Sequence, residues 1–272
     1  MGWRDRGIEV KTPDQVAAMR RAGLVVGRTL EVLRAAVRPG VTTGELDAIA
    51  EDAIRSAGAT PSFLGYQGFP ASICASVNDQ VVHGIPGDRR LGEGDLVSLD
   101  CGAIVDGWHG DAAITVPVGQ VREELLGLVA DTERAMWAGI AAARVGGRVG
   151  DISAAVEGSL RRAGRDGILE DYTGHGIGTA MHQPPDVPNV GRAGRGARLV
   201  EGIALAVEPM VTLGGAETDV LDDDWTVVTV DGTWAAHSEH TFVLTDTGAW
   251  VLTALDGGEE RLTALGVPYG GR

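Results

Sequence analysis

The sequence predicts an α+β fold built around a central antiparallel or mixed sheet. Helical patterns followed by β-type patterns occur twice along the 272 residues, an ungapped repeat relates two of the helical segments, and Asp106-Gly107 separates two β-type runs. Such an order of elements is typical of α+β proteins, and an Asp-Gly dipeptide between β-type runs predicts a tight hairpin. Because no linker divides the chain, we expect one domain over residues 1–272, with a short lead at 1–7 and related halves at about 8–120 and 121–256.

The first half begins with two predicted helices. Thr12 can cap the first helix, Pro13 suits its first turn, and apolar residues recur at helical spacing over residues 16–33. A proline-glycine pair ends this helix, and the second begins at Thr42 or Thr43.

The second helical segment has a repeat in the other half of the chain. GELDAIAEDAIRSAG (44–58) aligns without a gap on GDISAAVEGSLRRAG (150–164), and the preceding Gly40 falls over Gly146. Amphipathic helices can resemble one another by chance, but the matching glycines favour two structurally similar halves. A site between two such halves is a common place for chemistry.

Strand-like segments follow each helical region. They are residues 73–83, 204–213, 237–244 and 250–252. Glu208 and Pro209 interrupt the second of these segments, which indicates an edge or a bulge there. The last two segments resemble a closing hairpin around the turn at 246–248.

The segment 97–116, VSLDCGAIVDGWHGDAAITV, is predicted to fold back on itself at its Asp-Gly pair. Val105 would then pair with Trp108, and the register would place Asp100 and Asp111 on one face as diagonal neighbours. Diagonal Cα separations of roughly 7–8 Å allow the two carboxylates to converge on metal ions about 3.5–4 Å apart. The alternative is a hairpin with two solvated aspartates, and a bulge in its second strand would separate them.

Composition and charge argue against several classes of function. The chain has 38 acidic and 23 basic residues, a net charge of −15, which argues against binding to a nucleic-acid backbone. The first ten residues lack the apolar centre of a signal peptide, and no run approaches the roughly 18 apolar residues of a membrane span. Two cysteines, Cys74 and Cys101, fit a reducing compartment, so we expect a cytoplasmic protein that binds neither nucleic acid nor membrane.

Three further residues are candidates for a site. Glu208 lies inside an apolar run and Glu239 directly precedes another, and a carboxylate in such a position needs a partner. His175 is flanked by glycines, which permit close approach of an ion or a substrate. Taken separately, a strand-end glutamate more often faces water, and a lone histidine is more often structural. The glycines around His175 match a phosphate-binding loop only weakly.

Together, the five residues resemble the metal-ligand set of the methionine aminopeptidases, and the chain looks like a type I member of that family. The resemblance extends over residues 8–252. Its specific segments are KTPDQVAAMRRAG (11–23), GYQGFPASICASVNDQVVHGIP (65–86), LDCGAIVDGWHGDAAIT (99–115), YTGHGIG (172–178) with His182, VEPM (207–210) and SEHT (238–241). The fold that this resemblance implies is the α/β pita-bread fold, in which two related halves surround a dinuclear metal site.

The resemblance implies a role for each ligand. Asp100 would chelate one metal ion, and Asp111 and Glu239 would bridge both ions. His175 and Glu208 would complete the ligands of the other ion. Four carboxylates balance two divalent ions, and mostly oxygen ligands with one imidazole suit Mn²⁺, Fe²⁺, Co²⁺ or Zn²⁺. A hydroxide that bridges the ions would attack the first peptide bond.

The same resemblance implies catalytic and substrate-binding residues. Glu208 would accept and pass on a proton, His182 would stabilise the developing oxyanion, and His83 would contact the peptide nitrogen. The methionine pocket would consist of His83 and His182 together with Tyr66, Cys74 and Trp225. Phe63 and Met181 would lie near it.

Two residues depart from many relatives. Met181 stands where an aromatic residue is common, and Gln183 follows His182 where a glutamate is usual. We expect both changes to alter the rim of the pocket rather than the ligands, and the flexible methionine to affect fine specificity.

The expected function is removal of the initiator methionine from nascent proteins whose second residue is small, by a monomer that acts near the ribosome. An X-Pro peptidase or a creatinase-like hydrolase of the same fold is the nearest rival, but such enzymes carry a substantial N-terminal domain, and here ten residues precede Lys11. A non-catalytic relative that only binds peptide is the other rival, and such proteins usually lose ligands. A type II enzyme needs a helical insertion between Glu208 and Glu239, which are 31 positions apart.

Overall fold

The computed structural model describes residues 7–271, so all but the last residue of the predicted lead at 1–7 lies outside the described part of the chain. The helices are α1 (Pro13–Ala36), α2 (Thr43–Ser56), α3 (Glu123–Ala142), α4 (Val149–Arg162) and α5 (Glu259–Ala264), and a 3-10 turn, η2, lies at Tyr66–Gly68.

One large sheet and two small ones accompany these helices, and every pairing between their strands is antiparallel. The large sheet has the order β1-β4-β5-β14-β9-β7-β8, with β2 beside β4 and β15 beside β14. Its strands are β1 (Thr60–Pro61), β2 (Ile73–Val77), β4 (Leu96–Val105), β5 (Trp108–Pro117), β7 (Gly174–Gly176), β8 (Gln183–Val187), β9 (Ala204–Val207), β14 (Glu239–Leu244) and β15 (Ala249–Val251). The small sheets are β13 (Ala235–His237), β10 (Met210–Thr212) and β6 (Gly167–Ile168), and β11 (Thr218–Val220), β12 (Val227–Thr229) and β3 (Gln80–Val82).

The helices begin where the sequence predicts. The Thr12 hydroxyl accepts a hydrogen bond from the Gln15 backbone N–H, and the Gln15 side chain accepts one from the Thr12 N–H at 2.8 Å. Thr42 and Glu45 form the same reciprocal cap on α2. Such caps satisfy backbone donors that the first helical turn leaves free, so they fix both starting points.

The predicted repeat is structural. Helices α2 and α4 begin and end at equivalent positions of the two repeats, and Gly40 and Gly146 before them have φ angles of 90° and 91°. A positive φ of this size strains any residue with a Cβ, so both turns need glycine.

The central hairpin has the predicted register. Asp106 and Gly107 have φ angles of 52° and 81°, as a type I′ turn requires, and β4 pairs with β5 without a shift. Asp100 lies opposite Ala113, and Asp111 lies opposite Gly102, so the two aspartates share one face.

Two segments that the sequence predicts as single strands, one of them with a bulge, each form two separate strands in the structure. Residues 73–83 form β2 and β3, which belong to different sheets, because Asn78 adopts a φ of 63° and turns the chain. The side-chain amide of Asn78 donates to Asp95 at 2.9 Å, and its oxygen accepts from the Leu96 N–H at 2.9 Å. Residues 204–213 likewise divide at Glu208 and Pro209 into β9 and β10.

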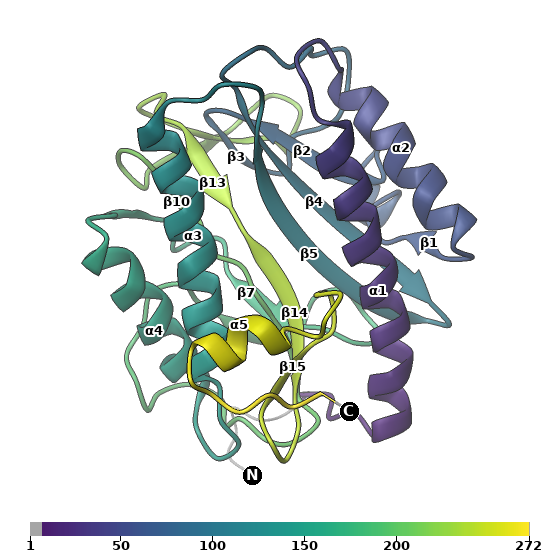
Figure 1. Ribbon diagram of the computed structural model, residues 1–272, viewed down its shortest axis with the longest axis vertical. Coiled ribbons are helices and arrows are strands. Elements are labelled where there is room, and N and C mark those ends of the chain that lie inside the picture. The colour runs from purple at the N-terminus through teal and green to yellow at the C-terminus, as the bar shows by residue number, and fades with distance from the viewer. Residues whose placement is uncertain (1–6, 272) are drawn as a thin grey trace.

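The helices cover the sheet in two pairs. Figure 1 shows α1 and α2 on one side of the molecule and α3 and α4 on the other, with β4, β5 and β14 running between them. One apolar cluster joins α1 and α2 to β2, β4 and β5, and another joins α3 and α4 to β9 and β14. Each half of the chain therefore has its own core, and the sheet connects the two. Within residues 7–271, no helix has the length and apolar character that a membrane crossing demands.

Candidate metal centre

Five neighbouring strands or strand ends each contribute one of the five predicted ligands. In the order of the sheet these ligands are Asp100 on β4, Asp111 on β5, Glu239 at the start of β14, Glu208 at the end of β9 and His175 on β7. The chain order is different, so the sheet topology brings together residues that are far apart in the sequence. The hairpin provides the two aspartates, and the second half provides the other three.

A cavity of about 210 Å³ opens above these ligands. All ten predicted site residues line it, and so do Phe63 and Met181, which were expected near the pocket. Their roles in binding and catalysis remain predictions. Sequence reasoning missed two further lining residues, Gln67 and Phe69, although both lie within the GYQGFP segment.

The ligand side chains are withdrawn from solvent and lack partners. Asp111, His175 and Glu239 are buried, and their ligand atoms lie within 4.8 Å of one another. His175 Nε2 lies 3.3 Å from Glu208 Oε1 without forming a hydrogen bond. One oxygen of each carboxylate has no hydrogen-bond partner among the described residues; these atoms are Asp100 Oδ1, Asp111 Oδ1, Glu208 Oε1 and Glu239 Oε1. Buried polar atoms are almost always paired, so this cluster needs an additional partner.

The cluster shifts the pKa values of its own members. Burial, reinforced by the neighbouring carboxylates, raises the pKa values of Asp111, Glu208 and Glu239 well above their ordinary values. Burial also raises the pKa of Asp100, to about 7. Burial and the nearby His182 lower the pKa of His175 to about 3, so its imidazole is neutral at pH 7 and can act as a ligand.

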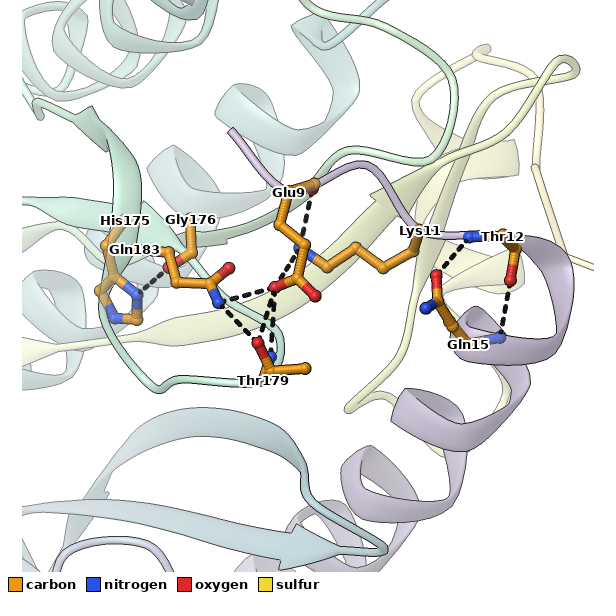
Figure 2. Close-up of polar contacts among 8 residues, drawn as sticks. All are labelled: Glu9, Lys11, Thr12, Gln15, His175, Gly176, Thr179 and Gln183. Carbon is orange, nitrogen blue, oxygen red and sulfur yellow. Dashed lines mark hydrogen bonds and ion pairs between the residues drawn. The ribbon is translucent and has the colours of Figure 1, made fainter. Parts of the chain in front are cut away.

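These donors fit divalent metal ions. Four carboxylates that converge in a buried cavity repel one another unless cations neutralise them. Carboxylate oxygens with one imidazole nitrogen are donors that first-row divalent metals accept. His175 Nδ1 lies 3.0 Å from the Gly176 carbonyl oxygen; a hydrogen bond there places the proton on Nδ1 and leaves Nε2 free to bind a metal (Figure 2).

Two more histidines face the cavity. His182 Nδ1 lies 2.9 Å from the Tyr66 hydroxyl, and the ring of His182 packs edge-on against that of His175 at 4.3 Å between centroids. When the Tyr66 hydroxyl donates this bond, the proton of His182 is on Nε2, which is then a donor. His83 has a φ of 59° and packs against Trp225, and burial lowers its pKa to about 4.

The wall of the cavity opposite the ligands is apolar. Phe63, Phe69, Cys74 and Met181 form one buried cluster, and Tyr66 and Trp225 pack against it. Phe69 meets Trp225 edge to face at 5.0 Å between ring centroids. The site thus combines a charged floor with a pocket for an apolar side chain.

The prediction that Gln183 lies at the rim of the pocket is wrong. Its side-chain amide donates to the Glu9 carboxylate at 2.6 Å, and it does not line the cavity. Figure 2 shows Glu9 between Lys11 and the segment that holds Thr179 and Gln183. Thr179 donates to the same Glu9 oxygen through its backbone N–H and its hydroxyl, both at 3.2 Å, and the Lys11 ammonium lies 3.8 Å away.

This Glu9 cluster, defined as Glu9, Lys11, Thr179 and Gln183, ties the N-terminal segment to the loop that carries Met181 and His182. Gly178 lies so close that a Cβ there would clash with Glu9 Oε2. No local sequence signal could have shown the contact, because Glu9 and Gln183 are 174 positions apart.

Known proteins share both the sequence and the architecture. A family model described as metallopeptidase family M24 matches residues 17–246. Methionine aminopeptidase 1 of Mycobacterium tuberculosis (strain CDC 1551 / Oshkosh) is 52% identical over 254 residues, which cover 91% of this chain and 96% of that protein. The chain belongs to metallopeptidase family M24. The predicted resemblance to its type I methionine aminopeptidases is confirmed.

Solved structures agree with this family assignment. The methionine aminopeptidase of Rickettsia prowazekii has a TM-score of 0.89 at 39% identity, and the match covers 90% of this chain and 99% of that one. A prolidase from Pyrococcus furiosus has a TM-score of 0.75 at 20% identity over 92% of this chain and 66% of that one, a likeness of fold alone. The predicted pita-bread fold is confirmed.

Proposed function

We propose that this M24 peptidase removes the N-terminal methionine from proteins and peptides whose second residue is small. The observation that carries the proposal is the convergence of four carboxylates and one imidazole, with unpartnered oxygens, beside an apolar pocket. Its similarity to enzymes named methionine aminopeptidase over about nine-tenths of the chain supports the same substrate.

Two divalent ions, of Mn, Fe, Co or Zn, would complete the centre. Asp100 would hold one ion, Asp111 and Glu239 would hold both, and His175 and Glu208 would hold the other. Such ions, when bound, acidify a water molecule, polarise a carbonyl group and anchor a free amine.

The apolar pocket selects the first side chain. Tyr66, Cys74 and Trp225 surround a space that accepts an unbranched apolar chain, and Met181 adds a flexible wall. The cavity is about 210 Å³, so little room remains for a large second side chain once methionine occupies it. This limit explains a preference for small second residues.

Three residues move or hold protons in the proposed reaction. Glu208 accepts a proton and returns it to the leaving amine, because its carboxylate lines the cavity beside the other ligands. His182 Nε2 donates a hydrogen bond to the oxygen on which negative charge develops. His83 contacts the nitrogen of the scissile peptide bond.

The setting follows from the proposed substrate. One catalytic domain spans residues 1–272, with halves at about 8–120 and 121–256 that share the site. It acts as a monomer in the cytoplasm, on nascent chains near the ribosome, and binds neither nucleic acid nor membrane. The net charge of −15 is consistent with a peptide substrate rather than a nucleic acid.

Metal analysis combined with a peptide assay tests the proposal. Purified protein should bind divalent metal and release methionine from Met-Ala-Ser. Norleucine and leucine should be removed more slowly, because norleucine lacks the sulfur and the branched leucine side chain reaches one atom less deep into the pocket. Preferential cleavage of Ala-Ala-Ser, or of a peptide whose second residue is proline but whose first is not methionine, would indicate another peptidase activity.

A further inference from the structure

His237 is a buried histidine whose side chain faces the metal centre and has no partner there. It is the last residue of β13, two positions before the ligand Glu239. Its side chain is 2% exposed, and Nε2 has no hydrogen-bond partner among the described residues. Leaving a buried nitrogen unpaired is destabilising, so this atom needs a partner.

The backbone around His237 fixes the direction of the ring. The Thr115 hydroxyl accepts a hydrogen bond from the His237 N–H at 2.9 Å and donates one to the His237 carbonyl at 2.8 Å. His237 also pairs with Met210 across two strands. The imidazole therefore projects from a well-anchored position rather than from a loose loop.

The ring lies next to Glu208, which is also a neighbour of His175. His237 Nε2 is 3.8 Å from Glu208 Oε2, whereas His175 Nε2 is 3.3 Å from Glu208 Oε1. Glu208 thus lies between two imidazoles, and each of its oxygens faces one of them. The distance of 3.8 Å exceeds that of a hydrogen bond, so His237 and Glu208 are near neighbours without a direct bond.

This separation fits two donors that share one cation. Ligand atoms about 2.0–2.2 Å from a metal ion lie roughly 3–4.3 Å from one another. The ligand atoms of Glu208, His237 and Glu239 all lie within 4.8 Å of one another. These three residues form a set of donors beside the one made by Asp111, His175 and Glu239, with Glu239 common to both.

We infer that His237 Nε2 is a sixth metal ligand, which binds the cation shared by Glu208 and Glu239. The inference rests on the metal centre of the proposed function and adds a second imidazole to it. A second nitrogen donor makes the centre favour Fe²⁺, Co²⁺ and Zn²⁺ over Mn²⁺. Imidazole nitrogen suits those three ions, whereas carboxylate oxygen suits Mn²⁺. A sequence signal existed, since residues two apart in an extended segment face the same side, so His237 and Glu239 were candidates for one site.

The test replaces His237 with glutamine and compares metal binding. His237→Gln keeps an N–H donor that can reach Glu208 but removes the imidazole ligand. The matched control is His240→Gln, because His240 is an imidazole of the neighbouring strand β14 whose ring contacts Thr253 and Trp137. Dissociation constants for Zn²⁺ and Mn²⁺, measured by chelator competition, and the visible spectrum of the Co²⁺ protein are the readouts.

We expect His237→Gln to weaken Zn²⁺ binding by at least about 10-fold, to weaken Mn²⁺ binding less, and to change the Co²⁺ spectrum. His240→Gln should change none of the three. Unchanged metal binding and an unchanged spectrum in His237→Gln would overturn the inference, while a wild-type protein that binds metal and cleaves Met-Ala-Ser would leave the proposed function intact. A wild-type protein that binds no metal would contradict both the inference about His237 and the proposed function.

A second measurement needs no variant, so it holds even if His237→Gln fails to fold. The proton NMR spectrum of the wild-type Co²⁺ protein shows strongly shifted, exchangeable signals from the ring N–H groups of imidazoles bound to the ion. The inference requires such signals from both His175 and His237. A spectrum with a signal from one imidazole alone would overturn it.

Discussion

Glu9 and Glu208 are both partly withdrawn from solvent, yet their surroundings shift their pKa values in opposite directions. Burial acts to raise the pKa of Glu9, but hydrogen bonds from Gln183 and Thr179 and the charge of Lys11 outweigh it, and the pKa is lowered. For Glu208, burial raises the pKa, and the charges of Asp100 and Asp111 raise it further.

The difference lies in the donors that each carboxylate meets. Protein donors satisfy the Glu9 carboxylate, which therefore serves the fold. The carboxylates of the metal centre retain unpaired oxygens and repel one another, so they require cations that the chain itself does not supply. The contrast separates a structural carboxylate from a ligand without reference to sequence position.

The largest expected effect is that of Asp111→Asn. This change removes a charge shared by both proposed ions, so bound metal and activity should fall together. The loss should exceed the roughly 10–100-fold that follows removal of an outer partner of a ligand. Metal content by mass spectrometry and turnover of Met-Ala-Ser measure it.

Asp106→Asn is the matched control for that change. Asp106 belongs to the same hairpin, but it is exposed at the turn and pairs with the exposed Arg21. Asparagine tolerates the positive φ of this position, so metal and activity should remain. If Asp111→Asn kept its metal while Asp106→Asn lost it, the assignment of the ligand would be wrong.

His182→Ala should affect turnover without removing metal. His182 lies beside His175 and is held by Tyr66, and its proposed role concerns charge that exists only in the transition state. We expect kcat to fall by about 10²–10³, with near-normal KM and metal content. Steady-state kinetics and metal analysis on one preparation distinguish this result from loss of a ligand, which would lower kcat and metal content together.

The metal-free protein should lose stability as the pH rises. The folded-state pKa of Asp100 is about 7, against roughly 3.9 in an unfolded chain, and those of Asp111, Glu208 and Glu239 are also raised. Above about pH 7 the buried histidines are neutral in both states, so the folded state binds more protons than the unfolded state through these carboxylates, and stability declines as the pH rises from about 7 to 9. The decline should be on the order of a few kcal/mol.

Thermal unfolding of chelated protein across this pH range tests the expectation. Metal-loaded protein should show the opposite trend, because deprotonated carboxylates bind cations more strongly. Asp100→Asn should flatten the decline of the metal-free protein. A metal-free protein that became more stable as the pH rose above about 7 would show that the cluster is already satisfied.

Local patterns predicted the parts of the molecule that local chemistry determines. The Asp106-Gly107 turn set the register that places Asp100 and Asp111 together, and the reciprocal caps set the helix starts. The division of residues 73–83 was not predicted, because Asn78 turns the chain through bonds to Asp95 and Leu96 on another segment.

The candidate site likewise has parts that the sequence predicted and parts that it did not. The five predicted ligands came from the resemblance to a known family, whereas the sheet order that unites them depends on pairings between distant strands. The position of Gln183 was wrong for that reason, since its partner Glu9 lies in the N-terminal segment. The environment of His237 likewise became evident only when Glu208 had been placed beside it.

The smallest expected effect concerns the Glu9 cluster. Gln183→Glu replaces a donor to Glu9 with a second carboxylate, so a hydrogen bond is lost and two like charges meet. Because Glu9 is partly exposed, we expect a loss of about 1 kcal/mol in the free energy of unfolding, with metal content unchanged. The loss should diminish below about pH 4, where glutamate becomes protonated.

The double variant Glu9→Gln with Gln183→Glu sharpens this test. It restores one carboxylate and one amide with their positions exchanged, so the amide at position 9 can donate to the carboxylate at 183. Urea unfolding of the four proteins gives the coupling energy, which should recover much of the loss caused by Gln183→Glu. Purely additive effects would mean that the 2.6 Å contact contributes nothing, and the contrast between Glu9 and Glu208 would then rest on burial alone.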